Sequence, residues 1–248
     1  VESESDPALL EWCVREELNQ TATRRMAVLD PVKVVIDNWD ETLRGTTKNA
    51  EGAKIGFVEL PNNPLDASAG VRTLSFGKEI WIDRADFMEV PEKKFFRMAP
   101  GQEVRLRGAC IFKCTGCVKD ANGVVTEIHG TWDESSWGGN AADGRKVKGT
   151  IHWVDCATGV KATVRLYERL FTEKDPLKDG SDQFLKYLNP DSLQTVTAYV
   201  EPALGEAKGL ERFQFERTGY FVADEYDSRP GSPVFNRTVT LKDSYKPA

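Results

Sequence analysis

Two histidines and five cysteines carry the most reactive side chains in this sequence of 248 residues. His129 and His152 both fall inside strand-like runs, and neither lies in a nucleophile elbow, a zinc-protease helix or a phosphate loop. A histidine in such a context is more often a structural or surface residue than a catalytic one. The sequence therefore shows no acid/base or nucleophile constellation, and we expect no catalytic residue on this chain.

Cys114 and Cys117 have a spacing typical of metal ligands, and Cys110 and Cys156 would be needed to complete a site of four thiolates. A structural zinc site normally uses two closely spaced pairs, and a single pair is visible here. Cys110 and Cys114 also fall on the apolar face of a predicted strand, where a free cysteine packs as a small hydrophobic residue. We therefore expect reduced thiols and no metal, although a cluster of the four cysteines stays an open alternative.

The most specific chemical pattern is an interleaving of arginine and lysine with aromatic residues. It occurs at residues 93–97 and again at residues 212–221, while Arg105 and Arg107 share one face of a strand. Recognition of single-stranded RNA needs planar cationic donors for base edges and aromatic faces for stacking, and a guanidinium can bind guanine through two parallel hydrogen bonds. The alternative is a solvated strand face whose cations form salt bridges.

The overall composition limits where such a site can be. A formal charge of −6 argues against a general nucleic-acid coat, so any RNA site must be local. A hydrophobic content of 40% and a charged content of 29% are those of an ordinary globular protein. No run approaches the roughly 20 apolar residues of a membrane helix, and no signal peptide is visible. We expect a cytoplasmic protein with no membrane partner, and the acidic start at Val1 suggests a fragment.

These residues must be positioned by strands, because helical periodicity is confined to the first 20 residues. There, Ser5 or Asp6 can cap a helix and Pro7 suits its first turn. The expected apolar face of this helix consists of Leu10, Cys13, Val14 and Leu18. A further short helical segment is expected at residues 181–188.

The rest of the chain reads as many short strands. In the clearest, which begins at Glu103, Val104 and Leu106 alternate with Arg105 and Arg107, so one face belongs to the core and the other carries guanidiniums. Residues 120–123 predict a hairpin turn, and residues 157–159 predict a second hairpin between the runs on either side. This pattern favours an all-β architecture of barrels or sandwiches.

Seven segments, in this order along the chain, closely resemble the C-terminal half of bacterial glutaminyl-tRNA synthetases: MAVLDPVKVVIDN, GKEIWIDRADF, EVRLRGA, DGRKVKGTIHWV, RLYERLF, FQFERTGYF and PVFNRTV. The resemblance runs from about residue 10 to residue 245. It implies two β-barrels, one inserted in the other, with an N-terminal helical segment. It assigns residues 1–22 to a connector from the catalytic domain, residues 23–36 plus 153–248 to the proximal barrel, and residues 37–152 to the distal barrel.

The resemblance also implies a function. The region would recognise the anticodon of a glutamine tRNA, while the parent enzyme uses ATP and magnesium in a separate domain whose signature motifs do not occur here, so we expect no cofactor on this chain. The implied partners are the glutamine tRNA and the catalytic domain of the same polypeptide, with no DNA and as a monomer. Two alternatives stay open, namely the corresponding region of an archaeal or eukaryotic glutamyl-tRNA synthetase and a β interaction module without an RNA role.

The anticodon contacts of the family fall on particular positions of this chain. Arg24 and Gln214 match residues that read the central uridine, and Arg217 belongs to the same surface. Arg97 matches the residue placed on the third base, a guanine in glutamine tRNAs.

The first base, which is cytidine or uridine, would lie near Arg105 and Arg107. Phe96 stands where the family has a lysine, and Leu65 stands where it has an asparagine. These departures put the local contacts in doubt, and Lys94 is the cation that would replace the missing lysine.

Overall fold

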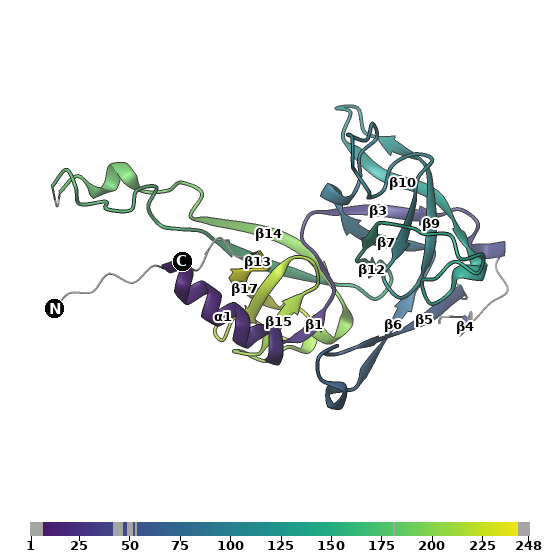
Figure 1. Ribbon diagram of the computed structural model, residues 1–248, viewed down its shortest axis with the longest axis horizontal. Coiled ribbons are helices and arrows are strands. Elements are labelled where there is room, and N and C mark those ends of the chain that lie inside the picture. The colour runs from purple at the N-terminus through teal and green to yellow at the C-terminus, as the bar shows by residue number, and fades with distance from the viewer. Residues whose placement is uncertain (1–6, 42–46, 49–51, 53, 181, 243–248) are drawn as a thin grey trace.

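The computed structural model describes residues 7–41, 47–48, 52, 54–180 and 182–242 (Figure 1). These ranges contain a single α-helix, several short 3₁₀ helices and strands in two seven-stranded sheets and a three-stranded one. The all-β prediction is therefore confirmed. Among the described residues, no helix is long and apolar enough to cross a membrane.

The first sheet closes on itself. In spatial order it consists of β1 (Thr23–Arg25), β15 (Arg212–Phe215), β16 (Gly219–Ala223), β17 (Val234–Thr240), β13 (Val160–Tyr167), β14 (Leu193–Val200) and β2 (Ala27–Val28). Its two outermost strands, β1 and β2, are separated in the chain by Met26 alone, so the two edges of the sheet must meet. A barrel closed in this way leaves few free strand edges.

The second sheet closes by the same device. Its order is β11 (Thr150–Ile151), β8 (Glu103–Leu106), β9 (Cys110–Lys119), β10 (Val125–Asp133), β3 (Pro31–Ile36), β7 (Glu79–Asp83) and β12 (Val154–Asp155). The outermost strands β11 and β12 are separated by His152 and Trp153. The third sheet, β4 (Thr47–Lys48), β5 (Lys54–Pro61) and β6 (Val71–Phe76), lies beside it.

The remaining short elements are 3₁₀ helices in the connections. They are η1 (Trp39–Glu41), η2 (Ala67–Ala69), η3 (Arg84–Asp86), η4 (Glu134–Ser136), η5 (Phe184–Tyr187) and η6 (Pro202–Glu206). The helical segment expected near residue 184 is thus a short 3₁₀ turn.

The second sheet is inserted into the first, because β3 to β12 lie in the chain between β2 and β13. The strand pairing does not follow the expected segment limits of 36/37 and 152/153. Strand β3 pairs with β7 and β10, and β12 pairs with β7, so both belong to the second sheet. The reason is packing, since Val32, Val34 and Ile36 bury their side chains in the core of that sheet. The limits of the barrels as separate domains stay a prediction.

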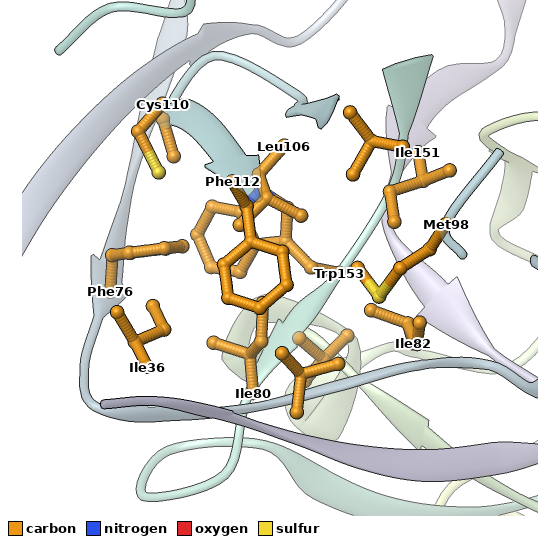
Figure 2. Close-up of a cluster of buried hydrophobic side chains, with 14 of the residues drawn as sticks. Ile36, Phe76, Ile80, Ile82, Met98, Leu106, Cys110, Phe112, Ile151 and Trp153 are labelled. Atoms are coloured by element: carbon orange, nitrogen blue, oxygen red, sulfur yellow. The ribbon is translucent and has the colours of Figure 1, made fainter. Parts of the chain in front are cut away.

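The largest hydrophobic core fills the second barrel (Figure 2). Phe76, Phe112 and Trp153 point into it, and the rings of Phe76 and Trp153 meet edge to face at 4.8 Å. The alternation predicted for β8 is confirmed, since Val104 and Leu106 are fully buried. Burial of such side chains contributes about 1.5–3 kcal/mol each and is the main force that holds the barrel together.

Helix α1 (Pro7–Thr21) lies against β15 and β17 of the first barrel, and its predicted apolar face is partly wrong (Figure 1). Leu18 and Val14 face Tyr220 and Val239, but Leu10 and Cys13 are exposed. Polar contacts add to this packing, among them a hydrogen bond of 2.8 Å from Arg15 Nε to the carbonyl oxygen of Thr240. The buried seam of the helix is therefore narrow. The expected cap residues Ser5 and Asp6 lie outside the described residues.

The first predicted hairpin is confirmed and the second is wrong. Residues 120–123 join β9 to β10, and Gly123 takes the left-handed conformation of the turn with φ of 80°. Residues 157–159, in contrast, lead from β12 in the second sheet to β13 in the first. Strand β12 pairs with β7 and β13 pairs with β14 and β17, so this turn carries the chain between barrels.

Candidate functional site

Four of the seven residues expected to bind RNA line one surface pocket of about 310 Å³. They are Arg24, Arg107, Gln214 and Arg217. Asn19 from the end of α1, Glu216, and Pro64 and Leu65 from the turn between β5 and β6 complete its wall. Elements of both barrels therefore build this pocket, which we call the junction pocket.

The turn between β5 and β6 is fixed to the first barrel by its asparagines. The N–H of Arg24 donates to the carbonyl oxygen of Asn62 at 2.7 Å, and Arg25 Nη1 donates to Asn62 Oδ1 at 2.7 Å. Asn63 Nδ2 donates to the carbonyl oxygen of Gln20 at 2.7 Å. These bonds place Leu65, which is 57% exposed, at the rim of the junction pocket.

Arg24 and Gln214 are neighbours because β1 pairs with β15 in parallel. Arg24 is 4% exposed and donates to the carbonyl oxygens of Ala22 and Asn19 at 2.7 and 2.6 Å. Gln214 Nε2 donates to the hydroxyl of Tyr220 at 3.1 Å. Burial lowers the pKa of Arg24, but a guanidinium stays charged at neutral pH. Some N–H groups of the Arg24 guanidinium are thus bonded within the protein. Gln214 still has one amide N–H and its carbonyl oxygen available for a ligand.

Arg107 is held by a buried carboxylate. Its Nε forms an ion pair with Glu216, which is 6% exposed and also pairs with Arg72 Nη2 at 3.1 Å. Arg72 Nε in turn lies 2.9 Å from Oε1 of Glu201, which is 2% exposed. Glu201 also pairs with Arg25 at 3.1 Å. This chain of alternating charges links both barrels beneath the junction pocket, and each buried charge in it has an opposite partner.

Arg217 follows Glu216 in the turn between β15 and β16 and has a left-handed backbone with φ of 66°. Its guanidinium binds both oxygens of Asp86, with Nη1 at 2.6 Å from Oδ2 and Nη2 at 2.8 Å from Oδ1. Burial acts to lower the pKa of Arg217, but the hydrogen bonds and charge of Asp86 outweigh it and raise this pKa. Arg97 Nη1 lies 3.3 Å from Asp86 Oδ1, so Arg97 is connected to the junction pocket through one carboxylate.

Arg105 and Lys94 lie elsewhere. Arg105 donates from Nε to the carbonyl oxygen of Gly139, and its Nη1 lies 3.4 Å from the carbonyl oxygen of Val147. It therefore fastens the segment after β10 to β8, while Arg107 turns to the junction pocket. Lys94 is exposed in a turn, with φ of 73°. The structure thus separates the predicted pair of Arg105 and Arg107, and the RNA contacts of all seven residues stay predictions.

A second pocket, of about 490 Å³, lies at the start of β8, and we call it the lysine pocket. Its charged residues are Lys113, Lys146, Lys148 and Glu103. Phe96 is 51% exposed in its wall, and Lys148 Nζ lies 4.4 Å from the centroid of the Phe96 ring. Glu103 of this pocket lies at the start of β8, and Arg107 of the junction pocket follows the end of that strand.

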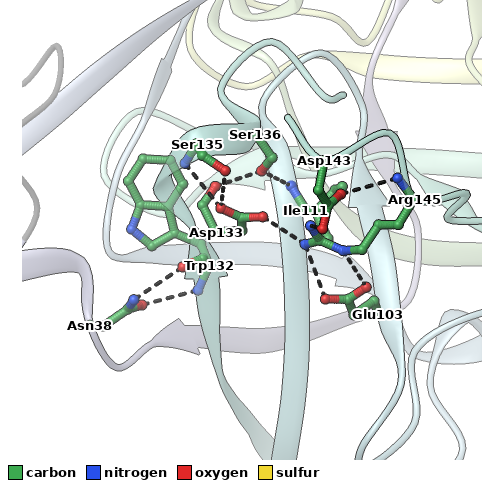
Figure 3. Close-up of polar contacts among 9 residues, drawn as sticks. All are labelled: Asn38, Glu103, Ile111, Trp132, Asp133, Ser135, Ser136, Asp143 and Arg145. Atoms are coloured by element: carbon green, nitrogen blue, oxygen red, sulfur yellow. Dashed lines mark hydrogen bonds and ion pairs between the residues drawn. The ribbon is translucent and has the colours of Figure 1, made fainter. Parts of the chain in front are cut away.

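Glu103 of the lysine pocket is bound by Arg145, which also holds two further carboxylates (Figure 3). Arg145 binds Glu103 at 3.0 Å, Asp133 at 2.6 Å and Asp143 at 2.9 Å. The hydrogen bonds to the three carboxylates raise the pKa of Arg145. The hydroxyl of Ser135 and then Arg145 lower the pKa of Asp133, while the backbone N–H of Arg145 and its guanidinium lower the pKa of Asp143. Because Arg145 engages Glu103, the carboxylate of this pocket is already paired, and the lysines determine its charge.

Sequence reasoning missed Asn19 and Glu216, which line the junction pocket, and Asp86 and His152, which hold Arg217 from outside its lining. All four have polar partners far away in the chain, as in the contact of 3.0 Å between Arg217 Nη1 and His152 Nδ1. Glu216 is close in the chain to Gln214 and Arg217, which were predicted as RNA-binding residues. Nothing in the local sequence indicated that its carboxylate would lie in the same pocket. The missing signal is the spatial pairing of charges, which has no local periodicity.

The described residues offer no group of three or more His, Cys, Asp and Glu side chains arranged to hold a metal ion. Cys110 and Cys114 are buried in the hydrophobic core of the second barrel. Burial raises the pKa of both thiols, that of Cys114 to about 11. Both cysteines therefore act as packing residues of this core.

Comparison with known proteins identifies similar chains. A family model described as the anti-codon binding domain of the class I tRNA synthetases (E and Q) matches residues 22–133, and a second model with this description matches residues 150–224. The glutamine–tRNA ligase of Bradyrhizobium diazoefficiens is 49% identical over 241 residues, which are 97% of this chain and 40% of that protein. Those of Nitrosomonas europaea and Clostridium kluyveri are 48% and 46% identical over 97% of this chain and 41% of their own lengths. The chain thus spans about 40% of the length of the curated relatives it matches.

Proposed function

The chain belongs to the anticodon-binding family of the class I tRNA synthetases for glutamate and glutamine, and on that premise we propose that it binds the anticodon loop of a glutamine tRNA. The observation that carries this proposal is the convergence of Arg24, Arg107, Gln214 and Arg217 in the junction pocket. These residues come from three distant parts of the sequence, and three of the four are cationic although the chain as a whole carries a charge of −6.

The proposal extends to the longer protein. Relatives named glutamine–tRNA ligase cover almost all of this chain, so we assign it to the anticodon-binding part of such a ligase. The ATP-dependent ligation then takes place in another region of the polypeptide, which is the second partner of this chain. A monomeric state and a cytoplasmic location stay predictions.

The chemistry of the junction pocket suits a base splayed out of a loop. Gln214 retains a carboxamide donor and acceptor, which can match the alternating acceptors and donor on the Watson–Crick edge of uracil. Arg107 and Arg217 add positive charge, and their carboxylate partners limit how far each guanidinium can move. Such fixed donors lose little conformational entropy on binding, which favours specific recognition over general attraction to phosphate.

The test is binding of the purified chain to a glutamine tRNA transcript and to a transcript with a substituted central base. We expect Gln214→Ala to weaken binding of the native transcript about 5- to 150-fold, as a base contact of roughly 1–3 kcal/mol would. Lys161→Ala, at an exposed position of β13, is the control and should bind as the unmodified chain does. Absence of tRNA binding even at low salt would instead favour a β interaction module without an RNA role.

The third base separates the glutamine from the glutamate alternative, because glutamate anticodons end in cytidine. If Arg97 binds guanine through O6 and N7, a change of that guanine to cytidine should cost roughly 1–3 kcal/mol. Arg97→Ala should cost a similar amount with the native transcript and little more with the cytidine transcript. Tighter binding of the cytidine transcript would support the glutamyl-tRNA synthetase alternative.

A further inference from the structure

Asp86 is a buried carboxylate shared by two arginines from different barrels. Asp86 is the last residue of η3, the short helix that follows β7, and its side chain is 3% exposed. Arg217 binds it with two short contacts of 2.6 and 2.8 Å, whereas Arg97 reaches one oxygen at 3.3 Å. Both guanidiniums therefore draw on Oδ1 of the same carboxylate.

Arg217 is fixed from a second side by His152. The ring of His152 is 2% exposed, and its Nε2 lies 2.9 Å from the carbonyl oxygen of Ala27 and 3.0 Å from Asp83 Oδ2. Since a carbonyl oxygen can only accept, Nε2 carries a proton, and Nδ1 is free to accept from Arg217 Nη1 at 3.0 Å. These contacts hold Arg217 in a left-handed backbone conformation that side-chain-bearing residues rarely adopt.

Arg97 is bound less firmly. Its side chain is 47% exposed, and besides Asp86 it donates to the carbonyl oxygen of Ala85 at 3.1 Å. A base that took up the guanidinium of Arg97 would draw it away from Asp86 Oδ1. The carboxylate would then serve Arg217 alone, and in a poorly solvated site an undivided ion pair is stronger.

From this geometry we infer that Asp86 is a positioning residue that couples the reading of the central and third anticodon bases. This inference rests on the proposed function, which places Arg217 in the pocket of the central base and Arg97 on the third base. A correct third base releases Asp86 to Arg217 and thereby strengthens the hold on the central base. By linkage, a correct central base strengthens binding of the third base by the same factor.

The coupling is measured with four transcripts, namely the native one, one with the central base changed, one with the third base changed, and one with both changed. Each loss is the fold-change in affinity relative to the native transcript. For the unmodified chain, the losses of the two singly changed transcripts, multiplied together, should exceed the loss of the doubly changed transcript by about fivefold or more. In Asp86→Asn this excess should disappear. The control is Asp191→Asn, at an exposed carboxylate in the turn before β14, and it should keep the excess.

Arg97→Ala gives a second test at a half-exposed position, where folding is not at risk. With Arg97 removed, Asp86 serves Arg217 whatever the third base is. In Arg97→Ala, the loss of affinity caused by changing the central base should therefore be the same with the native and with the changed third base. In the unmodified chain, this loss should be smaller when the third base is changed. Each comparison uses dissociation constants at one fixed salt concentration.

The outcomes separate the coupling from the proposed function. If the unmodified chain does not distinguish the four transcripts, the proposed function fails. Two other outcomes leave the anticodon assignment intact and overturn the coupling through Asp86. One is that the product of the two single losses equals the double loss in the unmodified chain, and the other is that the excess persists in Asp86→Asn.

Discussion

At the scale of single residues, charged side chains in this protein are defined by the partners that hold them. Arg24 is buried and donates hydrogen bonds to backbone carbonyl oxygens. Arg107 and Arg217 are held by carboxylates, and Arg97 is half exposed. Four residues of one type therefore have different freedom to meet a base. An alanine substitution at Arg24 removes structural bonds as well as an RNA contact, whereas one at Arg97 removes little structure.

Phe96 is the exposed aromatic residue of the lysine pocket, and we predict that it stacks on a nucleobase. Phe96→Ala should weaken binding of the tRNA by roughly 1–3 kcal/mol, the usual contribution of one base–aromatic stack. Phe96→Trp should retain most of the affinity, because it preserves an aromatic face. Tyr226→Ala, which removes an aromatic ring that is 78% exposed in the loop after β16, is the matched control. Equal weakening by both alanine variants would argue against a specific stack.

The thiols differ sharply in exposure, which predicts their reactivity. Cys13 is exposed on α1, whereas burial raises the pKa of Cys114 to about 11 and that of Cys156 to about 12. The thiolate is the reactive form, so an alkylating reagent near neutral pH should label Cys13 first and leave Cys110, Cys114 and Cys156 largely unlabelled in the folded chain. Mass spectrometry of the peptides gives the order. Loss of the fast label in Cys13→Ser is the control, and equal labelling after unfolding shows that burial was responsible.

At the scale of elements, neighbouring strands pack closely at Gly130 of β10. A Cβ atom there would overlap the carbonyl oxygen of Lys113 and the ring of Phe112. Gly130→Ala should therefore lower the free energy of unfolding by about 1–3 kcal/mol or more, as overpacking does. Gly116, on the neighbouring strand β9, has nothing within 4 Å of a built Cβ, so Gly116→Ala should change stability by less than about 0.5 kcal/mol. Urea titrations of both variants provide the comparison, and equal stabilities would contradict the packing.

At the scale of the whole molecule, Asp83 of β7 fixes the connection between β2 of the first barrel and β3 of the second, and its surroundings predict a pH dependence of stability. Burial alone would raise the pKa of Asp83, but the hydrogen bonds from His152 Nε2 and from the N–H groups of Asp30 and Leu29 hold it below its usual value. A depressed carboxyl pKa contributes stability above the unfolded pKa of about 3.9, and this contribution is lost as the pH falls through the folded pKa. The free energy of unfolding of the unmodified chain should thus exceed that of Asp83→Asn by its full amount at pH 6. This difference should become smaller below about pH 4.

The control for this prediction is Asp191→Asn, at an exposed carboxylate in the turn before β14. Its stability relative to the unmodified chain should vary much less between pH 6 and pH 3, because exposed charges contribute little. An Asp83→Asn difference that stays constant over this pH range would show that the carboxylate contributes through its shape rather than its charge.

The sequence by itself determined the all-β class, the alternation of Val104 and Leu106 with Arg105, and the hairpin at residues 120–123. Strand alternation and turn chemistry are local properties, readable within a few residues. The order of the seven matching segments likewise determined the family. Local reasoning failed where two patterns looked alike, as at residues 157–159, where a turn between unpaired strands has the sequence of a hairpin.

The resemblance already implied one surface for Arg24, Gln214 and Arg217, but the tertiary structure alone decided that Arg107 joins them while Arg105 does not, and which acids hold these cations. Arg24, Arg107 and Gln214 meet because β1 pairs with β15 and because the end of β8 reaches the same junction, contacts that span up to 190 residues of chain. The sharing of Asp86 by Arg97 and Arg217 depends on the way the second barrel is seated against the first. Ion pairs have no period along a sequence, and their partners are chosen by the packing of the barrels, so no pattern in the residues predicts them.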